Sequence, residues 1–384
     1  MDDRDYLPQV TALAVNGNDL YVGGAFRTAG NASEAHVARW DGVGWSALGD
    51  GLGRFYGDVP VWALAVRGDE LFVGGRFVSA GASAANNLAV WNGTTWSELG
   101  GGVTGAEPVA IKTLAADATR LAAGGSFVTT HGLNNFALWD GVRWSAPGAD
   151  TGQGITGDSV AAMVAGAEGV FVGGTFTFVG QTPAQNIALW DGVHGSALGS
   201  GVNGSVYALC RRGSELFAGG RFTVAGGVTA TNIARWDGTN WSALGNGLNG
   251  TLYGLACSDR ELFAGGTFGA AGGVTASNIA RWNGTNWSTL GAGVGGTVRA
   301  LAFGDGSLYA SGLFKSAGGV NATNIARWDG AHWFALGGGV SGTVSSLPRI
   351  RPPPVSALAL AGNELLVGGD FTLAGNTAAT NVAR

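Results

Sequence analysis

The chain has 384 residues, including 71 Gly, 17 Phe and 14 Trp, and only 12% of its residues are charged. Frequent glycine turns and large aromatic side chains are typical of all-β proteins. A net charge of −5 without a run of like charges argues against nucleic acid as a partner. The charged N-terminus, Met1 to Asp5, is unlike a signal peptide, and no stretch approaches the roughly 20 apolar residues that span a bilayer, so we expect no membrane insertion.

One short motif recurs along the chain: Gly-Gly, then any residue, then Phe. Its copies lie 46 to 57 residues apart, which is the period of a propeller blade, and they make residues 1–384 one repetitive domain. In one copy Ser311-Gly312 replaces the Gly pair. The first positions are Gly23, Gly74, Gly124, Gly173, Gly219, Gly265, Ser311 and Gly368, and the Phe residues are Phe26, Phe77, Phe127, Phe176, Phe222, Phe268, Phe314 and Phe371.

A single copy, residues 205–250, predicts four strands. Residues 206–210 are a short apolar run, 216–222 carry the Gly pair, and 232–236 and 241–244 flank an Asp237-Gly238 turn, in which positive φ angles would suit a two-residue hairpin. Four antiparallel strands make one blade, so we expect an eight-bladed β-propeller. In chain order the predicted blades are residues 10–48, 61–99, 111–147, 160–198, 206–244, 252–290, 298–336 and 355–384.

Two Trp residues recur at fixed places in the repeat. We interpret them as core residues, because a sugar-binding platform would not need a Trp at the same place in every copy. The Gly pair is expected to let a bulky aromatic ring of an adjacent strand or blade approach and to tolerate a bulge. The first Trp series is Trp40, Trp91, Trp139, Trp190, Trp236, Trp282 and Trp328; the second is Trp45, Trp96, Trp144, Trp241, Trp287 and Trp333, interrupted by Gly195.

These motifs resemble kelch repeats. The longer pattern Leu-Phe-Ala-Gly-Gly-x-Phe, followed by Asn-Ile-Ala-Arg-Trp-Asp-Gly-x-x-Trp-Ser-Ala-Leu-Gly, is still more similar to the propeller repeats of fungal cortical polarity markers and of bacterial surface proteins. The resemblance implies a propeller fold. It does not imply one function, since kelch-like propellers include peptide-binding modules, surface adhesins and a copper oxidase.

The eighth copy is predicted to lack its outer strand. The Trp that follows the Gly pair by 17 residues would fall immediately after Arg384, and nothing in residues 1–9 matches the outer-strand pattern. We expect either a short eighth blade or a piece of a longer protein. The open edge could pair with a strand of another chain.

Cys210 and Cys257 are the only two thiols and lie at similar places in adjacent repeats. The inner strands of neighbouring blades could bring them together as a disulfide. We favour the alternative of two small buried apolar residues.

The repeats differ most in the connections from strand four to the next strand one. The step from Leu244 to Leu255 is 11 residues, whereas four other connections take 15 to 22, all on one face of the predicted ring. A second variable position lies two residues before the strand-one Leu and is expected to surround the mouth of the central channel. It reads Thr11, Trp62, Lys112, Ala161, Tyr207, Tyr253, Arg299 and Ser356.

We expect a shallow binding site at this mouth, with aromatic anchors and cations that pair with an acidic group on a peptide or glycan. Unconstrained drift of surface positions is the alternative. The predicted ligand-binding residues are Arg54, Tyr56, Trp62, Lys112, Tyr207, Tyr253, Arg299, Arg349 and Arg351.

Catalytic chemistry is not indicated. His36, His131, His194 and His332 lie at places that do not converge on one ion, so we expect no metal or other cofactor. Glu107 and Asp58 lie in insertions and are interpreted as solvated loop residues.

We therefore expect a non-enzymatic binding module, extracellular or on the cell surface, for a protein or carbohydrate ligand. The alternatives are a structural spacer or assembly unit, or a fragment of a larger surface protein, and a kelch-type oxidase or glycosidase is the least favoured.

Overall fold

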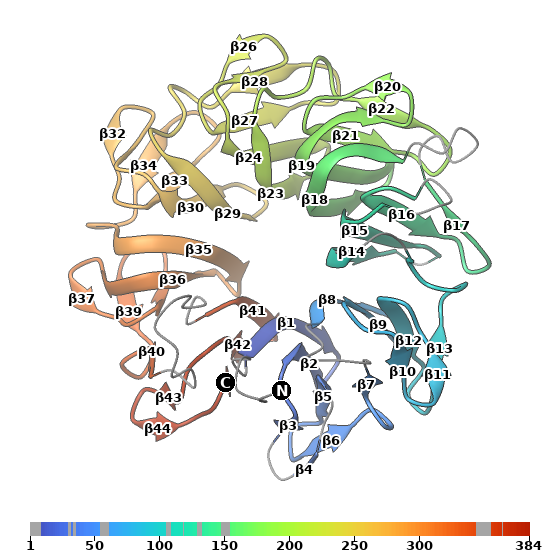
Figure 1. Cartoon of the computed structure of the whole chain (residues 1–384). Coiled ribbons are helices and arrows are strands. Elements are labelled where there is room, and N and C mark those ends of the chain that lie inside the picture. The colour runs from blue at the N-terminus through green and yellow to red at the C-terminus, as the bar shows by residue number, and fades with distance from the viewer. Residues whose placement is uncertain are drawn as a thin grey trace, which may run out of the picture.

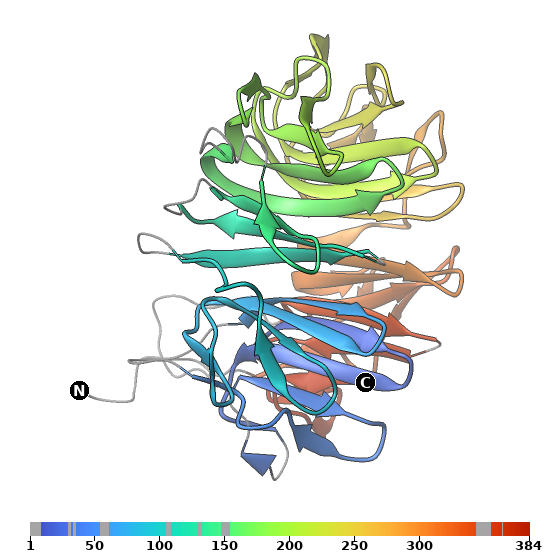
Figure 2. The ribbon, with the colours of Figure 1, turned by 90° about the vertical axis from the view of Figure 1, so that its right-hand side faces the viewer.

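A computed structural model describes residues 9–29, 32–33, 36–53, 61–104, 109–117, 119–128, 133–146, 154–342, 355–362 and 364–384. Strands arranged in eight radial sheets surround a common axis (Figure 1), and the strands run along that axis (Figure 2). The described residues contain no helix, so none of them form a helix that could cross a membrane. The fold is a β-propeller, which confirms the all-β prediction, and the eight sheets are consistent with eight blades.

Seven sheets have four antiparallel strands on their main path, and the eighth has three within the described residues. We number the blades one to eight in chain order. The innermost strands are β1 (Gln9–Asn16), β8 (Val61–Arg67), β14 (Ala110–Ala116), β18 (Ile155–Gly166), β23 (Ser205–Arg212), β29 (Thr251–Cys257), β35 (Val294–Gly304) and β41 (Ala357–Ala361). The second strands are β2 (Asp19–Ala25), β9 (Glu70–Gly75), β15 (Leu121–Ser126), β19 (Gly169–Val179), β24 (Glu215–Arg221), β30 (Leu262–Thr267), β36 (Ser307–Ala317) and β42 (Glu364–Gly368).

The outer half of each blade is built from shorter strands. The third strands are β5 (Val37–Trp40), β12 (Leu88–Trp91), β16 (Phe136–Trp139), β21 (Ile187–Trp190), β27 (Ile233–Trp236), β33 (Ile279–Trp282), β38 (Ile325–Trp328) and β45 (Val382–Ala383). The fourth strands are β6 (Trp45–Ala47), β13 (Trp96–Glu98), β17 (Trp144–Ser145), β22 (Gly195–Ala197), β28 (Trp241–Ala243), β34 (Trp287–Thr289) and β39 (Trp333–Ala335).

Short ribbons occupy several connections between strands two and three and some of the links between blades. They are β3 (Thr28–Ala29), β4 (Ala32–Ser33), β7 (Leu52–Gly53), β10 (Ser79–Ala80), β11 (Ser83–Ala84), β20 (Thr182–Pro183), β25 (Val224–Ala225), β26 (Val228–Thr229), β31 (Ala270–Ala271), β32 (Val274–Thr275), β37 (Val320–Asn321), β40 (Val340–Ser341), β43 (Leu373–Ala374) and β44 (Thr377–Ala378).

The two glycines of the repeat have different roles. A Cβ on Gly173 would lie 2.6 Å from Val206 Cγ1 of the next blade, so the first glycine lets neighbouring blades pack closely. A Cβ on Gly220 would lie 2.0 Å from the Ser205 carbonyl oxygen of its own sheet. The bulky neighbour is therefore an aliphatic side chain rather than an aromatic ring.

Large aromatic side chains form the core between blades, as the repeat predicts. The eight repeated Phe side chains are at most 7% exposed. The paired Trp rings within a blade are tilted against each other, with centroids 5.5 Å apart for Trp236 and Trp241. Adjacent blades therefore share one apolar layer after another around the ring.

The turn between strands three and four differs from the predicted two-residue hairpin. Trp236 pairs with Trp241, which leaves four residues in the turn, and of these Gly238 has a positive φ of 100° whereas Asp237 does not. The Asp237 carboxylate instead accepts backbone N–H bonds from Thr239 and Asn240 at 2.8 and 2.7 Å. Asp237 stabilises the turn through hydrogen bonds to its carboxylate rather than through a positive φ angle of its own.

The first and eighth blades pack against each other as other neighbours do. A Cβ on Gly368 would lie 2.5 Å from Val10 Cγ1, and the Val10 N–H donates to the Gly369 carbonyl at 3.2 Å. Within the described residues the two termini exchange no strand between these sheets. The ring is closed by side-to-side packing.

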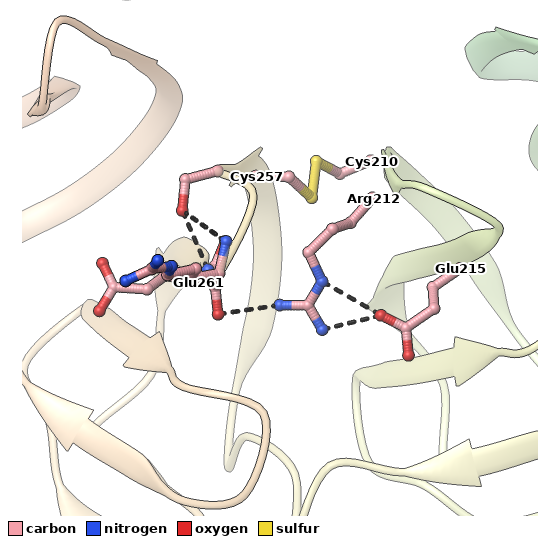
Figure 3. Close-up of a disulfide and its surroundings, with 7 residues drawn as sticks. Cys210, Arg212, Glu215, Cys257 and Glu261 are labelled. Atoms are coloured by element: carbon pink, nitrogen blue, oxygen red, sulfur yellow. Dashed lines mark hydrogen bonds and ion pairs between the residues drawn. A yellow bond between two sulfur atoms is a disulfide. The ribbon is translucent and has the colours of Figure 1, made fainter.

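The preference for two separate thiols is wrong: Cys210 and Cys257 form a disulfide (Figure 3). Their separation of 47 residues is one more than the local repeat of 46. Because successive side chains of a strand point to opposite faces, this offset turns Cys210 toward blade six and Cys257 back toward blade five. Arg212 crosses the same junction and donates to the Arg260 carbonyl at 3.1 Å.

Candidate functional site

The variable position near the channel mouth is a β-bulge. In seven innermost strands the pairing with the second strand skips one residue, so two residues of the inner strand face one residue of its partner. The skipped residues are Thr11, Trp62, Lys112, Ala161, Tyr207, Tyr253 and Arg299.

The second glycine of the repeat makes room for each bulge. Gly220 pairs with Val206, Gly219 pairs with Ala208, and Tyr207 is left without a partner between them. Val206 is completely buried, whereas Tyr207 is 38% exposed. The bulge therefore directs one side chain per blade out of the packed interface, and all these residues lie near the start of strand one, at the same end of the channel.

The central channel contains a cavity of about 330 Å³. It is lined by inner-strand residues of blades seven, eight, one, two and three, including four members of the predicted ring. Trp62 is half-buried there, and Lys112 is exposed. The ring members in its wall are Thr11, Trp62, Lys112 and Ser356.

Three other predicted residues contact one another across blades five, six and seven. The rings of Tyr207 and Tyr253 are stacked, with centroids 6.0 Å apart and an interplanar angle of 26°. The Arg299 guanidinium lies over Tyr253, 5.5 Å from the ring centroid. This cation–π contact and the ring stacking hold the three side chains in one row.

The ring of bulge residues is positively charged. Lys112 and Arg299 are its two cations, both exposed, and none of the eight ring positions is Asp or Glu. Cations without neighbouring carboxylates attract an anion to this end of the ring, and the attraction weakens as the salt concentration rises. Lys112 on β14 and Arg299 on β35 lie on opposite sides of the ring (Figure 1), so Arg299 is the cation that lies beside the tyrosines.

The remaining predicted site residues, Arg54, Tyr56, Arg349 and Arg351, lie outside the described residues, as do Glu107, Asp58 and His131. The structure brings Tyr207, Tyr253 and Arg299 into contact and places Trp62 and Lys112 on one cavity. Within the described ranges no group of three His, Cys, Asp or Glu residues could hold a metal ion.

The disulfide joins the two strands that carry Tyr207 and Tyr253, a possibility that the sequence interpretation considered but did not favour. The sequence did contain a signal for the disulfide, because the spacing of the two Cys residues is one residue longer than the repeat. This crosslink fixes the inner strands of blades five and six to each other near the stacked tyrosines.

No protein-family model matches the sequence, and the search of curated proteins finds no match. Among solved structures the chain is similar to the computationally designed Ika8 protein, with 17% identity, a TM-score of 0.58 and coverage of 95% of this chain and 94% of that chain. It is more distantly similar to YCF48 bound to D1 peptide, with 11% identity, a TM-score of 0.46 and coverage of 84% and 93%. The β-propeller domain of the Trilobed protease from Pyrococcus furiosus matches with 10% identity, a TM-score of 0.44 and coverage of 86% and 97%.

Proposed function

We propose that the chain is a non-enzymatic binding module whose channel mouth recognises an acidic group on a partner peptide. The observation that carries the proposal is the set of bulges. They aim aromatic and cationic side chains at one end of the channel from strands that are otherwise packed into the ring. A rigid scaffold that displays variable side chains lowers the conformational entropy lost on binding.

The stacking of the tyrosines favours an acidic peptide over a neutral glycan. Stacking on a sugar requires a free aromatic face, and the two faces of Tyr253 are taken by Tyr207 and Arg299. Tyr253 therefore offers a ligand its hydroxyl rather than a ring face, and the Arg299 guanidinium beside it suits a carboxylate.

The proposal includes an extracellular or cell-surface location. The Cys210–Cys257 disulfide supports it, since disulfides persist in oxidising compartments. The resemblance to the kelch-like repeats of surface proteins also supports this location. A spacer or assembly role remains the alternative function.

The experiment is an array of acidic and neutral peptides, together with glycans, probed with the whole chain. We expect acidic peptides to be retained and the Tyr207→Ala/Tyr253→Ala variant to lose about tenfold or more in affinity. Arg143→Gln is the matched control, because Arg143 is an exposed cation on an outer turn with 83% of its side chain accessible. Equal retention by the double variant, or a preference for neutral glycans, would contradict the proposal.

A further inference from the structure

The charged side chains of blades five to seven are separated between the two ends of the ring. Residues 199–342 are described without a gap and contain six carboxylates. All six lie at the turns between strands one and two or between strands three and four, which form the end of the ring opposite the channel mouth. They are Glu215, Asp237, Asp259, Glu261, Asp305 and Asp329.

Three cations of the same blades lie at the mouth end. Arg221 is the last residue of β24, Arg299 is on the bulge of β35, and Lys315 lies near the end of β36. All three are exposed. We call these three residues the cationic sector. Since residues 199–342 place no carboxylate at this end, the cationic sector attracts anions.

Arginines at the opposite end of these blades are paired, unlike those of the cationic sector. Arg235 contacts Glu215 at 2.9 Å, and Arg281 contacts Glu261 at 3.2 Å. Arg221 lies six residues after Glu215 on the same strand, which is roughly 20 Å along an extended chain. This separation is well beyond the Debye length of about 8 Å at physiological ionic strength, so Glu215 does not neutralise Arg221.

The side chain of Arg221 is directed from blade five toward blade six. Gly219 lies two residues earlier, on the same face of β24, and a Cβ there would lie 2.4 Å from Leu252 Cδ2. Leu252 precedes Tyr253 on β29. The face of β24 that carries Arg221 therefore packs against the strand that carries Tyr253.

The equivalent residue of blade four shows a contact that this direction allows. Thr175 Oγ1 donates to Ser205 Oγ of blade five at 3.0 Å. By strand register, the residues equivalent to Thr175 and Ser205 one blade further are Arg221 and Thr251. Arg221 therefore extends over the start of β29, whereas Arg299 reaches Tyr253 from blade seven.

The backbone that carries Arg221 is held in place where β24 ends. The next residue, Phe222, is only 3% exposed. The Asn203 carboxamide oxygen accepts the N–H groups of Thr223 and Val224 at 2.8 and 2.9 Å. Because the base of the side chain is fixed, less conformational entropy is lost when Arg221 binds an anion.

We propose that the partner peptide carries a second acidic residue, which binds Arg221, while the first binds Arg299 beside the tyrosines. This inference rests on the proposed function and names the partner more closely, as a segment with at least two acidic residues that lies across blades five to seven. Arg221 and Arg299 start from strands two blades apart, which favours two acidic groups over one. Lys315 adds attraction that speeds association.

The probes are labelled peptides of equal length, made of Gly and Ser, that carry either one Glu or two Glu residues at increasing separations. Binding to the whole chain is measured by fluorescence anisotropy. We expect the best two-Glu peptide to bind about fivefold or more tightly than the one-Glu peptide. The gain should shrink as the salt concentration rises, because exposed charges are screened.

Arg221→Gln should remove the gain from the second Glu and leave the affinity for the one-Glu peptide unchanged. The matched control is Arg260→Gln, which removes an exposed cation of blade six at the opposite end of the ring and should change neither affinity. Both substitutions are at exposed side chains, so the melting temperature should stay the same and loss of folding would not explain the result.

Equal affinity of the one-Glu and two-Glu peptides would overturn this inference alone, provided that Tyr207→Ala/Tyr253→Ala still weakens the one-Glu peptide. A one-Glu peptide that binds this double variant equally well, or no binding of any peptide, would overturn the proposed function as well. Equal losses in Arg221→Gln and Arg260→Gln would show general charge attraction and also overturn the inference.

Two further outcomes would overturn the choice of a peptide as the partner. One is tighter, Arg221-dependent binding of heparin, since an anionic polysaccharide would then be the ligand. The other is self-association of the chain, seen in sedimentation velocity, that the two-Glu peptide does not reverse, since a second copy would then cover the cationic sector.

Discussion

Val206 and Tyr207 are neighbours on β23, yet they differ in burial and in how much the equivalent residue varies between blades. Val206 is fully buried against Gly173 of blade four, and the equivalent residue in every other described blade is Val, Ile or Leu, at most 2% exposed. Tyr207 is on the bulge, where the other blades carry aromatic, cationic, hydroxyl or small apolar residues. In this repeat, one residue of a strand packs between blades, and the next residue is free to vary without disturbing that packing.

The largest expected effect comes from adding a side chain at the bulge glycine. Gly220→Thr should destabilise the fold by more than about 4 kcal/mol, because its Cβ would clash with the Ser205 carbonyl, which is backbone and cannot move aside. Gly44→Thr is the control, since a Cβ there meets nothing within 4 Å and Thr95 occupies the equivalent place. Calorimetric unfolding compares the two, and similar stabilities would refute the role given to the glycine.

The disulfide should have an intermediate effect. Replacing Cys210 and Cys257 by Ala should cost about 2–4 kcal/mol of unfolding free energy, because the crosslink restricts the unfolded chain. Denaturant titration under non-reducing conditions measures the difference. If the variant matched the native chain, the bond would contribute nothing to the frame that supports Tyr207 and Tyr253.

The smallest expected effect concerns the outer turns. Two backbone N–H bonds, from Asn240 and then Thr239, lower the pKa of Asp237 below its ordinary value of 3.8. A carboxylate with a lowered pKa in the folded state stabilises the fold above its unfolded pKa, and this contribution is lost as the pH falls through the folded pKa.

Asp237→Asn should therefore flatten the dependence of the melting temperature on pH below about 4. Asn92 and Asn283 already occupy this place in two blades and make the same bonds, so the variant should fold normally. An unchanged pH profile would show that the turn carboxylate is not linked to folding.

Much of the fold could be predicted because its determinants are local and repeated. The Gly pair, the Phe and the two Trp residues identify a four-stranded blade from one copy, and the period identifies the ring. The hairpin turn was predicted with the wrong mechanism, since an Asp-Gly pair does not reveal whether the backbone or the carboxylate makes the turn.

The site was predicted only in part. Comparison of the copies found the ring position, and the Gly pair indicated that a bulge is tolerated, but which residue the bulge displaces depends on the pairing between strands. The disulfide was misjudged because the Cys residues were compared by neighbouring residues rather than by their spacing against the repeat.

The most direct test of the account is the affinity of the chain for an acidic peptide compared with the same peptide carrying Gln in place of Glu, measured by isothermal titration calorimetry. The native chain should prefer the acidic peptide, and Lys112→Glu/Arg299→Glu should remove or reverse that preference while the melting temperature stays unchanged. An acidic preference that survives this double charge reversal would contradict recognition at the channel mouth.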